Sequence, residues 1–121
     1  MQDWGQEQQR PPMQDQDDAA WAPPPEREVD IRDFDPWDPQ AQPPSRQGWI
    51  WIPGYEGMNG EWIPGYYRPS EARQGYVFEP GYWRGRVYVE GYWRPVERPG
   101  WHWIPGHYGP RGRWLAGRWS H

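Results

Sequence analysis

The hydrophobic positions of residues 46–121 follow one short pattern: an aromatic residue, a glycine three positions later, and usually a second aromatic residue two positions after the glycine. The pattern occurs six times, with its glycines at 54, 65, 81, 91, 106 and 117. Ahead of several glycines two aromatic residues lie two positions apart, as Trp49 and Trp51 do, which places them on one face of a β-strand. No helix is predicted, and we expect an all-β domain.

The spacing of the glycines shows how the repeat is divided. The gaps alternate between short and long, so the true unit is a pair of motifs of about 26 residues that occurs three times, at residues 46–72, 73–97 and 98–121. Glycine-rich segments separate the two motifs of each unit, as in the loops of β-hairpins. We predict six short strands in three hairpins, which pair residues 49–56 with 61–67, 76–83 with 86–93, and 101–108 with 113–119.

The Pro-Gly step inside the motif is predicted to lie within a strand. If it reversed the chain, Tyr82 and Trp83 would form a strand of only two residues. We expect a bend or a bulge instead, and a one-residue bulge would bring Trp114 and Trp119 to the same face. Three equal units favour a pseudo-threefold small barrel or prism with its aromatic faces inward. A linear stack of hairpins is the alternative.

Residues 1–45 form an acidic, proline-rich arm of a different kind. The chain up to residue 47 carries eleven acidic residues against four arginines, a formal charge of −7, whereas the remainder carries six against nine, a formal charge of +3. Such a polar arm buries too little apolar surface to offset chain entropy, so we expect it to be disordered or to adopt polyproline II structure. The isolated Trp21, Phe34 and Trp37 are exceptions, able to dock on this domain or on a partner.

The aromatic motif resembles the YXWGXW repeat, also written WXXGXW, of a family of bacterial envelope proteins. Residues 114–119 fit W-x-x-G-x-W fully, and residues 78–83 and 88–93 fit with a different first aromatic residue. The last position departs from tryptophan at Tyr67, Tyr108 and Glu56. The resemblance implies a protein of the bacterial cell envelope or a secreted protein, in the periplasm or associated with the outer membrane, and it implies no defined activity.

Features that would fix the compartment are missing from the residues themselves. There is no cysteine, which excludes disulfides and thiol metal sites. No apolar run reaches the roughly 18 residues of a transmembrane segment. The first residues lack the basic and apolar regions of an export signal, so a signal peptide or lipid anchor would have to precede Met1. The envelope location therefore rests on the resemblance.

The aromatic side chains of the repeat are the candidate binding surface. Tryptophan and tyrosine rings are flat faces to which sugar rings, proline-rich peptides or nucleobases stack. The same rings are needed for the hydrophobic core of a small domain without disulfides, so the core is the favoured place for most of them and the remainder are available for a groove or a self-association surface. The candidate binding residues are Trp49, Trp62, Tyr66, Tyr82, Trp83, Tyr92, Trp93, Trp101, Trp114 and Trp119.

The charged residues give weaker signals. Arginines 84, 86, 94, 113 and 118 lie beside aromatic residues, as in single-stranded nucleic acid binders, but the small positive charge of the domain and its acidic arm argue against that partner. Cation–π contacts and pairing with glutamates 61, 71, 90 and 97 are the favoured uses. The aspartates at 30, 33, 35 and 38 lack the glycine and closing glutamate of an EF-hand. The histidines at 102, 107 and 121 lack further metal ligands.

Catalysis is not predicted, because no nucleophile elbow, phosphate loop or paired-carboxylate arrangement is recognisable. We expect no catalytic residue, metal or cofactor. The expected function is that of a non-enzymatic structural or interaction module of the bacterial cell envelope, which acts through its aromatic faces and strand edges on a protein or cell-wall glycan. The alternatives are a glycan- or peptidoglycan-binding module, a self-assembling β-rich homo-oligomer and a single-stranded nucleic-acid binder.

Overall fold

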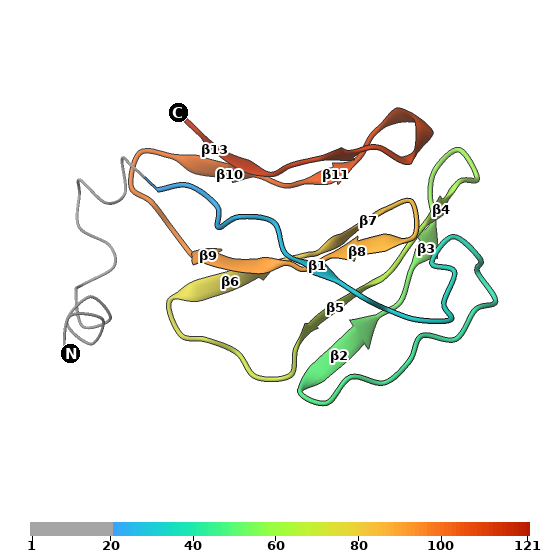
Figure 1. The fold of residues 1–121 in the computed structure, drawn as a ribbon. Coiled ribbons are helices and arrows are strands. Elements are labelled where there is room, and N and C mark those ends of the chain that lie inside the picture. Colours follow the sequence, from blue (N-terminus) through green and yellow to red (C-terminus); the bar gives the residue numbers. More distant parts are fainter. Residues whose placement is uncertain (1–20) are drawn as a thin grey trace.

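The computed structural model describes residues 21–121 and shows an all-β protein (Figure 1). Within these residues the regular elements are thirteen short strands and one 3₁₀ turn, η1 (Pro110–Gly112). The strands are β1 (Glu28–Val29), β2 (Trp49–Ile52), β3 (Tyr55–Glu56), β4 (Trp62–Ile63), β5 (Tyr66–Pro69), β6 (Tyr76–Glu79), β7 (Tyr82–Arg84), β8 (Val87–Val89), β9 (Tyr92–Pro95), β10 (His102–Ile104), β11 (His107–Tyr108), β12 (Trp114–Leu115) and β13 (Arg118–Ser120). The described elements include no helix long and apolar enough to cross a membrane.

The three predicted hairpins are confirmed, and each predicted strand is divided in two. Hairpin 1 pairs β2 with β5 and β3 with β4; hairpin 2 pairs β6 with β9 and β7 with β8; hairpin 3 pairs β10 with β13 and β11 with β12. All six pairings are antiparallel. The interruption falls at the motif glycine in every strand, so Pro-Gly lies inside the hairpin arm and does not reverse the chain.

The register continues unchanged through each interruption. In hairpin 1 Trp51 faces Tyr67 before the interruption, and Tyr55 faces Ile63 after it. Each strand therefore skips two residues, which leaves no extra residue on either side. The same holds in the other two hairpins. The one-residue bulge that we expected is wrong, because both strands are interrupted equally.

The cross-strand pairing explains the two aromatic positions of the motif. The first aromatic residue of one motif faces the last position of the other motif of the same hairpin. Five of these six pairs are aromatic, with ring centroids 4.7 to 5.4 Å apart and the rings tilted or edge to face, an arrangement favoured by the ring quadrupole. In the sixth pair Trp62 faces Glu56, the residue at which the sequence pattern is broken.

The same aromatic side chains explain the glycine. A Cβ atom on Gly65 would lie 2.6 Å from Cζ2 of Trp51 and closer still to the carbonyl oxygen of Ile52 on the facing strand. The other five motif glycines are crowded in the same way by the first aromatic residue of the opposite motif and by backbone. The motif is therefore reciprocal, since each aromatic ring covers the glycine of its partner motif.

Each unit begins with the same tight turn. The turns start at Arg46, Arg73 and Arg98, and the backbone N–H of the aromatic residue three positions later donates to the arginine carbonyl oxygen at 2.9 to 3.1 Å. The intervening glycine has a φ of 83 to 85°, a left-handed conformation that favours glycine. The guanidinium carbon lies 3.8 to 4.5 Å from the centroid of that aromatic ring, a cation–π contact.

The hairpins stack with hairpin 2 in the middle, and residues 21–121 form no closed barrel (Figure 1). Tyr88 of hairpin 2 accepts a hydrogen bond from the backbone N–H of Tyr67 in hairpin 1, and Tyr108 of hairpin 3 accepts one from Trp83 of hairpin 2. The Trp83 indole N–H donates to Gly65 in hairpin 1. The expected closed barrel is therefore not found among these residues, whose hairpin sheets stay separate. Hydroxyl-to-backbone contacts instead join each hairpin to its neighbour.

Residues 21–45 pack on the hairpins, where Trp21, Phe34 and Trp37 dock on this domain, one of the two places expected for them. Strand β1 adds to β8 and makes a three-stranded sheet with β7. Phe34 is buried in the core, within ring contact of Trp51 and Trp83. The side chain of Trp37 donates to the carbonyl oxygen of Gly85. The arm docks because its few aromatic residues reach the spaces between the hairpins. The expected disorder of residues 1–20 lies outside the described residues.

Candidate functional site

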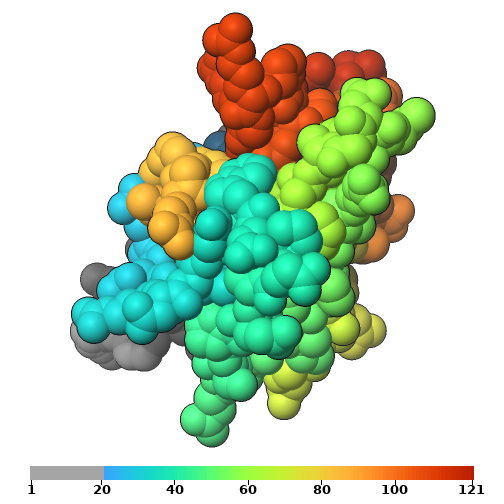
Figure 2. Space-filling view, turned by 90° about the vertical axis from the view of Figure 1, so that its right-hand side faces the viewer, coloured from blue at the N-terminus to red at the C-terminus, as the bar shows by residue number. Residues whose placement is uncertain are grey.

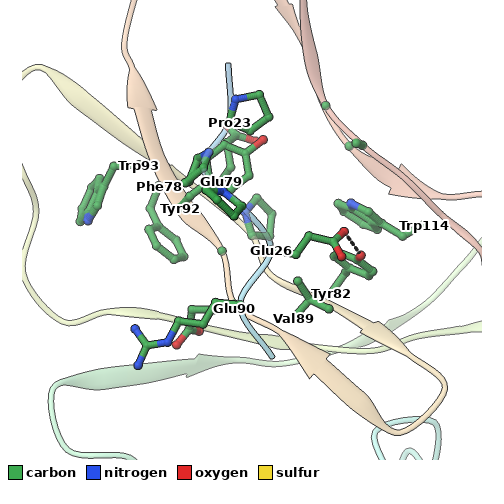
Figure 3. A pocket seen from close by; sticks show the side chains of 18 of the residues that line it. Pro23, Glu26, Phe78, Glu79, Tyr82, Val89, Glu90, Tyr92, Trp93 and Trp114 are labelled. Carbon is green, nitrogen blue, oxygen red and sulfur yellow. Dashed lines mark hydrogen bonds between the residues drawn. The ribbon is translucent and has the colours of Figure 1, made fainter. Parts of the chain in front are cut away.

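A cleft of about 410 Å³ separates part of the arm from the hairpins (Figure 3). We call residues 21–29 the strap and this hollow the strap cleft. The prolines 23, 24 and 25 of the strap form one wall, and Pro23 and Glu26 face the hairpins in Figure 3. The opposite wall is made by aromatic side chains of the repeat: Trp49, Phe78, Tyr82, Tyr92, Trp93 and Trp114.

Ion pairs and backbone hydrogen bonds hold the strap in place. The Arg84 guanidinium binds the carboxylates of Glu26, at 3.1 Å, and Glu28, at 2.7 Å. The Tyr82 hydroxyl donates to Glu26, and the backbone N–H of Glu90 donates to the carbonyl oxygen of Arg27 at 2.9 Å. The strap side chains from residue 22 to residue 28 are nevertheless exposed. Exposed ion pairs are weak, so the strap is held less firmly than the core.

The aromatic wall is continuous across two hairpins. Tyr82 of hairpin 2 and Trp114 of hairpin 3 stack in parallel, with ring centroids 5.2 Å apart and planes 5° apart. At the start of the strap, Trp21 contacts the rings of Tyr92 and Trp103. Rings of this kind bury apolar area and keep a polar atom for solvent or ligand. The cleft therefore offers half-buried ring faces along the path that the strap follows.

Two glutamates at the cleft are neutralised by arginines. Nε of Arg94 lies 2.6 Å from Glu79, and Nη2 of Arg46 lies 2.8 Å from Glu90. None of these four side chains is more than 19% exposed. A buried charge is tolerated only with its partner, so these carboxylates are committed to ion pairs. Neither is free to act as a general base.

The titration of the cleft tyrosine follows from its surroundings. Burial, and next the hydrogen bond to Glu26, raise the pKa of Tyr82 to about 12. Hydrogen bonds from Tyr82 and Arg84 lower the pKa of Glu26 below its ordinary value. Burial likewise raises the pKa of Tyr92 to about 12. The strap contact is therefore strongest where Glu26 is ionised and Tyr82 is protonated.

The raised tyrosine pKa values predict an alkaline limit to stability. A group whose pKa rises on folding stabilises the protein fully below its unfolded pKa, here 10, and loses that contribution as pH rises towards the folded value of about 12. We expect the Tm to be constant just below pH 10 and to fall above it, with phenolate absorbance at 295 nm appearing as the protein unfolds. Phenolate absorbance that develops fully near pH 10, with unchanged near-UV circular dichroism, would contradict this.

A second cleft lies where the tips of the hairpins meet the arm. We call it the loop-end cleft; its volume is about 780 Å³. Figure 2 faces this end of the molecule and shows the orange-red loop of hairpin 3 and the light green loop of hairpin 1 projecting next to each other above the teal arm. The side chains that define the cleft are Trp37, Asn59, Glu61, Trp62, Tyr108 and Arg111.

The ten aromatic residues proposed from sequence fall into different places. Five line the strap cleft: Trp49, Tyr82, Tyr92, Trp93 and Trp114. Trp62 lines the loop-end cleft, and Trp83 is fully buried, which leaves no ring face for a ligand. Three are partly buried outside both clefts: Tyr66 packs on the core, Trp101 lies beneath Arg98, and Trp119 packs on Trp103.

Sequence reasoning missed the strap residues and the arginine that binds them. Arg84 lies 58 residues after Glu26 and 56 after Glu28. Only the opposite charges of the arm and the repeat pointed to their contact. Of the four glutamates expected to pair with arginine, only Glu90 forms an ion pair within residues 21–121, and its partner Arg46 is in another unit.

The aspartates and histidines considered as metal ligands form local contacts or are exposed. Asp35 and Asp38 accept hydrogen bonds from backbone N–H groups two residues later, as turn-forming aspartates do. His121 contacts the ring of Trp101, and the other two histidines are exposed. In the described part of the chain no three histidine, aspartate or glutamate side chains are grouped so as to hold a metal ion.

Comparison of this chain with family models, with curated proteins and with solved structures finds no match. The resemblance to the YXWGXW repeat family stays a prediction that rests on the motif. The geometry of the two clefts is therefore the basis for a functional proposal.

Proposed function

We propose that this protein is a non-enzymatic interaction module that binds an extended, proline-rich and acidic segment of a partner protein in the strap cleft. The observation that carries the proposal is the strap itself, because the chain's own prolines 23 to 25 line the cleft opposite the aromatic wall. A partner segment of the same chemistry would take the place of the strap.

The contacts of the strap define what such a segment needs. Proline-rich segments are extended before they bind, so they lose little entropy when they dock on aromatic rings. An acidic residue after the prolines meets Arg84, as Glu26 does. The edge of β8 then adds backbone hydrogen bonds, as it does with β1. These three features together are more selective than aromatic stacking alone.

Three further features belong to the proposal. A non-enzymatic role is supported by the glutamates of the cleft, which are bound by Arg46 and Arg94. Of the arginines considered for nucleic acid, Arg84, Arg86 and Arg94 contact carboxylates, which favours a protein partner. The bacterial cell envelope as its location is supported by the resemblance of the motif.

A synthetic peptide with the sequence of residues 21–29 tests the proposal. The double variant Glu26→Ala, Glu28→Ala weakens the chain's own strap and leaves the cleft intact. We expect the labelled peptide to bind the variant about tenfold more tightly than the unaltered chain, because a site closed by its own strap loses apparent affinity in proportion to the open fraction. Fluorescence anisotropy measures both dissociation constants.

Two controls show whether the strap cleft is responsible. Adding Arg84→Ala to the double variant removes the partner of the peptide carboxylates, so the gain in affinity should disappear. A peptide with alanine in place of its three prolines should bind more weakly. Equal affinity of the peptide for the unaltered chain and for the double variant, or no binding to either, would refute the proposal.

A further inference from the structure

We propose that the loop-end cleft is a second binding site, which holds a sugar ring of a glycan. Segments of all three hairpins and of the arm meet there, and the site shares no lining residue with the strap cleft. The inference rests on the loop-end residues alone and does not require a partner peptide.

The aromatic side chains of this cleft are fixed through their polar atoms. The indole N–H of Trp62 donates to the carbonyl oxygen of Pro36 at 3.1 Å, and that of Trp37 donates to Gly85 at 2.7 Å. The Tyr108 hydroxyl accepts the backbone N–H of Trp83 at 2.9 Å. All three aromatic side chains are half-buried. Their hydrogen bonds to other elements hold the rings in position before a ligand arrives, which lowers the entropy cost of binding.

Exposed polar side chains complete the cleft on the loops. Glu61 accepts the backbone N–H of Asn59 at 3.0 Å through one carboxylate oxygen, which orients the carboxylate within the loop. On the opposite loop Arg111 has a left-handed backbone, with a φ of 61°, inside η1. Asn59, Glu61 and Arg111 are all exposed. A carboxylate, an amide and a guanidinium thus lie beside three fixed aromatic rings.

Three fixed aromatic rings beside a carboxylate, an amide and a guanidinium fit a sugar better than they fit a nucleobase or a proline-rich peptide. A sugar ring presents C–H groups that pack on an aromatic face and hydroxyls that both donate and accept hydrogen bonds. Glu61 accepts from hydroxyls, Arg111 donates to them, and the Asn59 amide does both. A nucleic acid would bring phosphates next to Glu61 with a single arginine lining the cleft to offset them. A volume of about 780 Å³ accommodates more than one sugar ring.

The experiment is a titration of the full chain, labelled with nitrogen-15, with chitotetraose, cellotetraose and an oligothymidylate of eight nucleotides. The indole N–H signals of Trp37 and Trp62 report on the loop-end cleft, and that of Trp114 reports on the strap cleft. We expect at least one of the two saccharides to shift the Trp37 and Trp62 signals to saturation, with the Trp114 signal unchanged.

The variant Asn59→Ala, Glu61→Gln tests the polar side chains. It should weaken saccharide binding by about tenfold, the loss expected for one hydrogen bond to a charged group. Glu71→Gln, on an exposed connector, is the matched control and should leave the affinity unchanged. Both variants keep the aromatic residues, so unchanged indole spectra verify the fold.

Three results would overturn the inference: no shift of Trp37 and Trp62 with either saccharide, shifts with the oligothymidylate only, or equal saccharide affinity in the Asn59→Ala, Glu61→Gln variant and the unaltered chain. Peptide binding in the strap cleft is read from a different probe and different variants. Failure of one proposal therefore leaves the other intact.

Discussion

Replacing Gly65 with alanine is expected to unfold hairpin 1 and to lower the free energy of unfolding by at least about 3 kcal/mol. The added Cβ would lie 2.6 Å from the Trp51 ring and also meets the carbonyl oxygen of Ile52 and the backbone N of Gly54. Two of these atoms are backbone atoms of the facing strand, so they move only if the strands separate. Denaturant unfolding followed by circular dichroism measures the loss.

Gly75→Ala is the matched control for this prediction. Gly75 has a φ of 85° and open space around the added Cβ, so alanine there costs only the strain of a left-handed conformation, about 1 kcal/mol. A larger loss at Gly65 shows that the motif glycine is needed for close approach of the opposite ring. Equal losses at the two positions would show that the reciprocal aromatic contact is not what requires glycine.

Phe34→Ala is expected to destabilise the whole domain by about 3 to 5 kcal/mol, although Phe34 belongs to the acidic arm. The side chain is 6% exposed and fills the space between Trp51 of hairpin 1 and Trp83 of hairpin 2. Alanine would leave a cavity at the junction of the two hairpins. Thermal and denaturant unfolding, each followed by near-UV circular dichroism, measure the change.

Met58→Ala provides the comparison, because Met58 is fully exposed in the loop of hairpin 1. A surface substitution of this kind changes the free energy of unfolding by less than about 0.5 kcal/mol. If Phe34→Ala unfolds at the same denaturant concentration as Met58→Ala, the arm does not contribute to the core. The expected difference instead places residues 21–45 within the folding unit.

The local features of the fold could be predicted from the sequence, because they repeat. Hairpin ends and loops follow from the spacing of the motif glycines, and the structure places all three hairpins accordingly. The interruption of both strands of a hairpin at the same level could not be predicted, because the sequence pattern was interpreted for each strand separately. A bulge needs an extra residue in one strand only. In hairpin 3 the strand that contains Trp114 and Trp119 and the strand that faces it are both interrupted by two residues, so the register is unchanged.

The docking of the arm depends on contacts between residues far apart in the sequence. Phe34 reaches Trp83 across almost 50 residues of sequence, and Glu26 reaches Arg84 across 58. Phe34 was expected to dock on this domain or on a partner, but the sequence did not show which of the two, nor that Phe34 would fill the space between Trp51 and Trp83. A few well-placed aromatic residues were enough to order a segment whose mean hydropathy predicts disorder.

The candidate site could be predicted only as a set of aromatic residues. Tyr82 and Trp83 are adjacent in the chain and equally aromatic, yet Tyr82 lines the strap cleft and Trp83 is fully buried. Which of the two faces the core depends on how hairpin 2 lies between its neighbours. Sequence spacing therefore identified the rings but could not separate those of the core from those of a cleft.

The reciprocal contact between aromatic rings and glycines is completed within a single hairpin, and this has a consequence for how such chains change length. A duplicated unit would bring all the partners of its own motif, so insertion or deletion of a whole unit disturbs only the surfaces between neighbours. Loss of half a unit would instead leave two aromatic positions and a glycine without their counterparts. We expect chains of this type to differ from one another by whole pairs of motifs, and to have an even number of them.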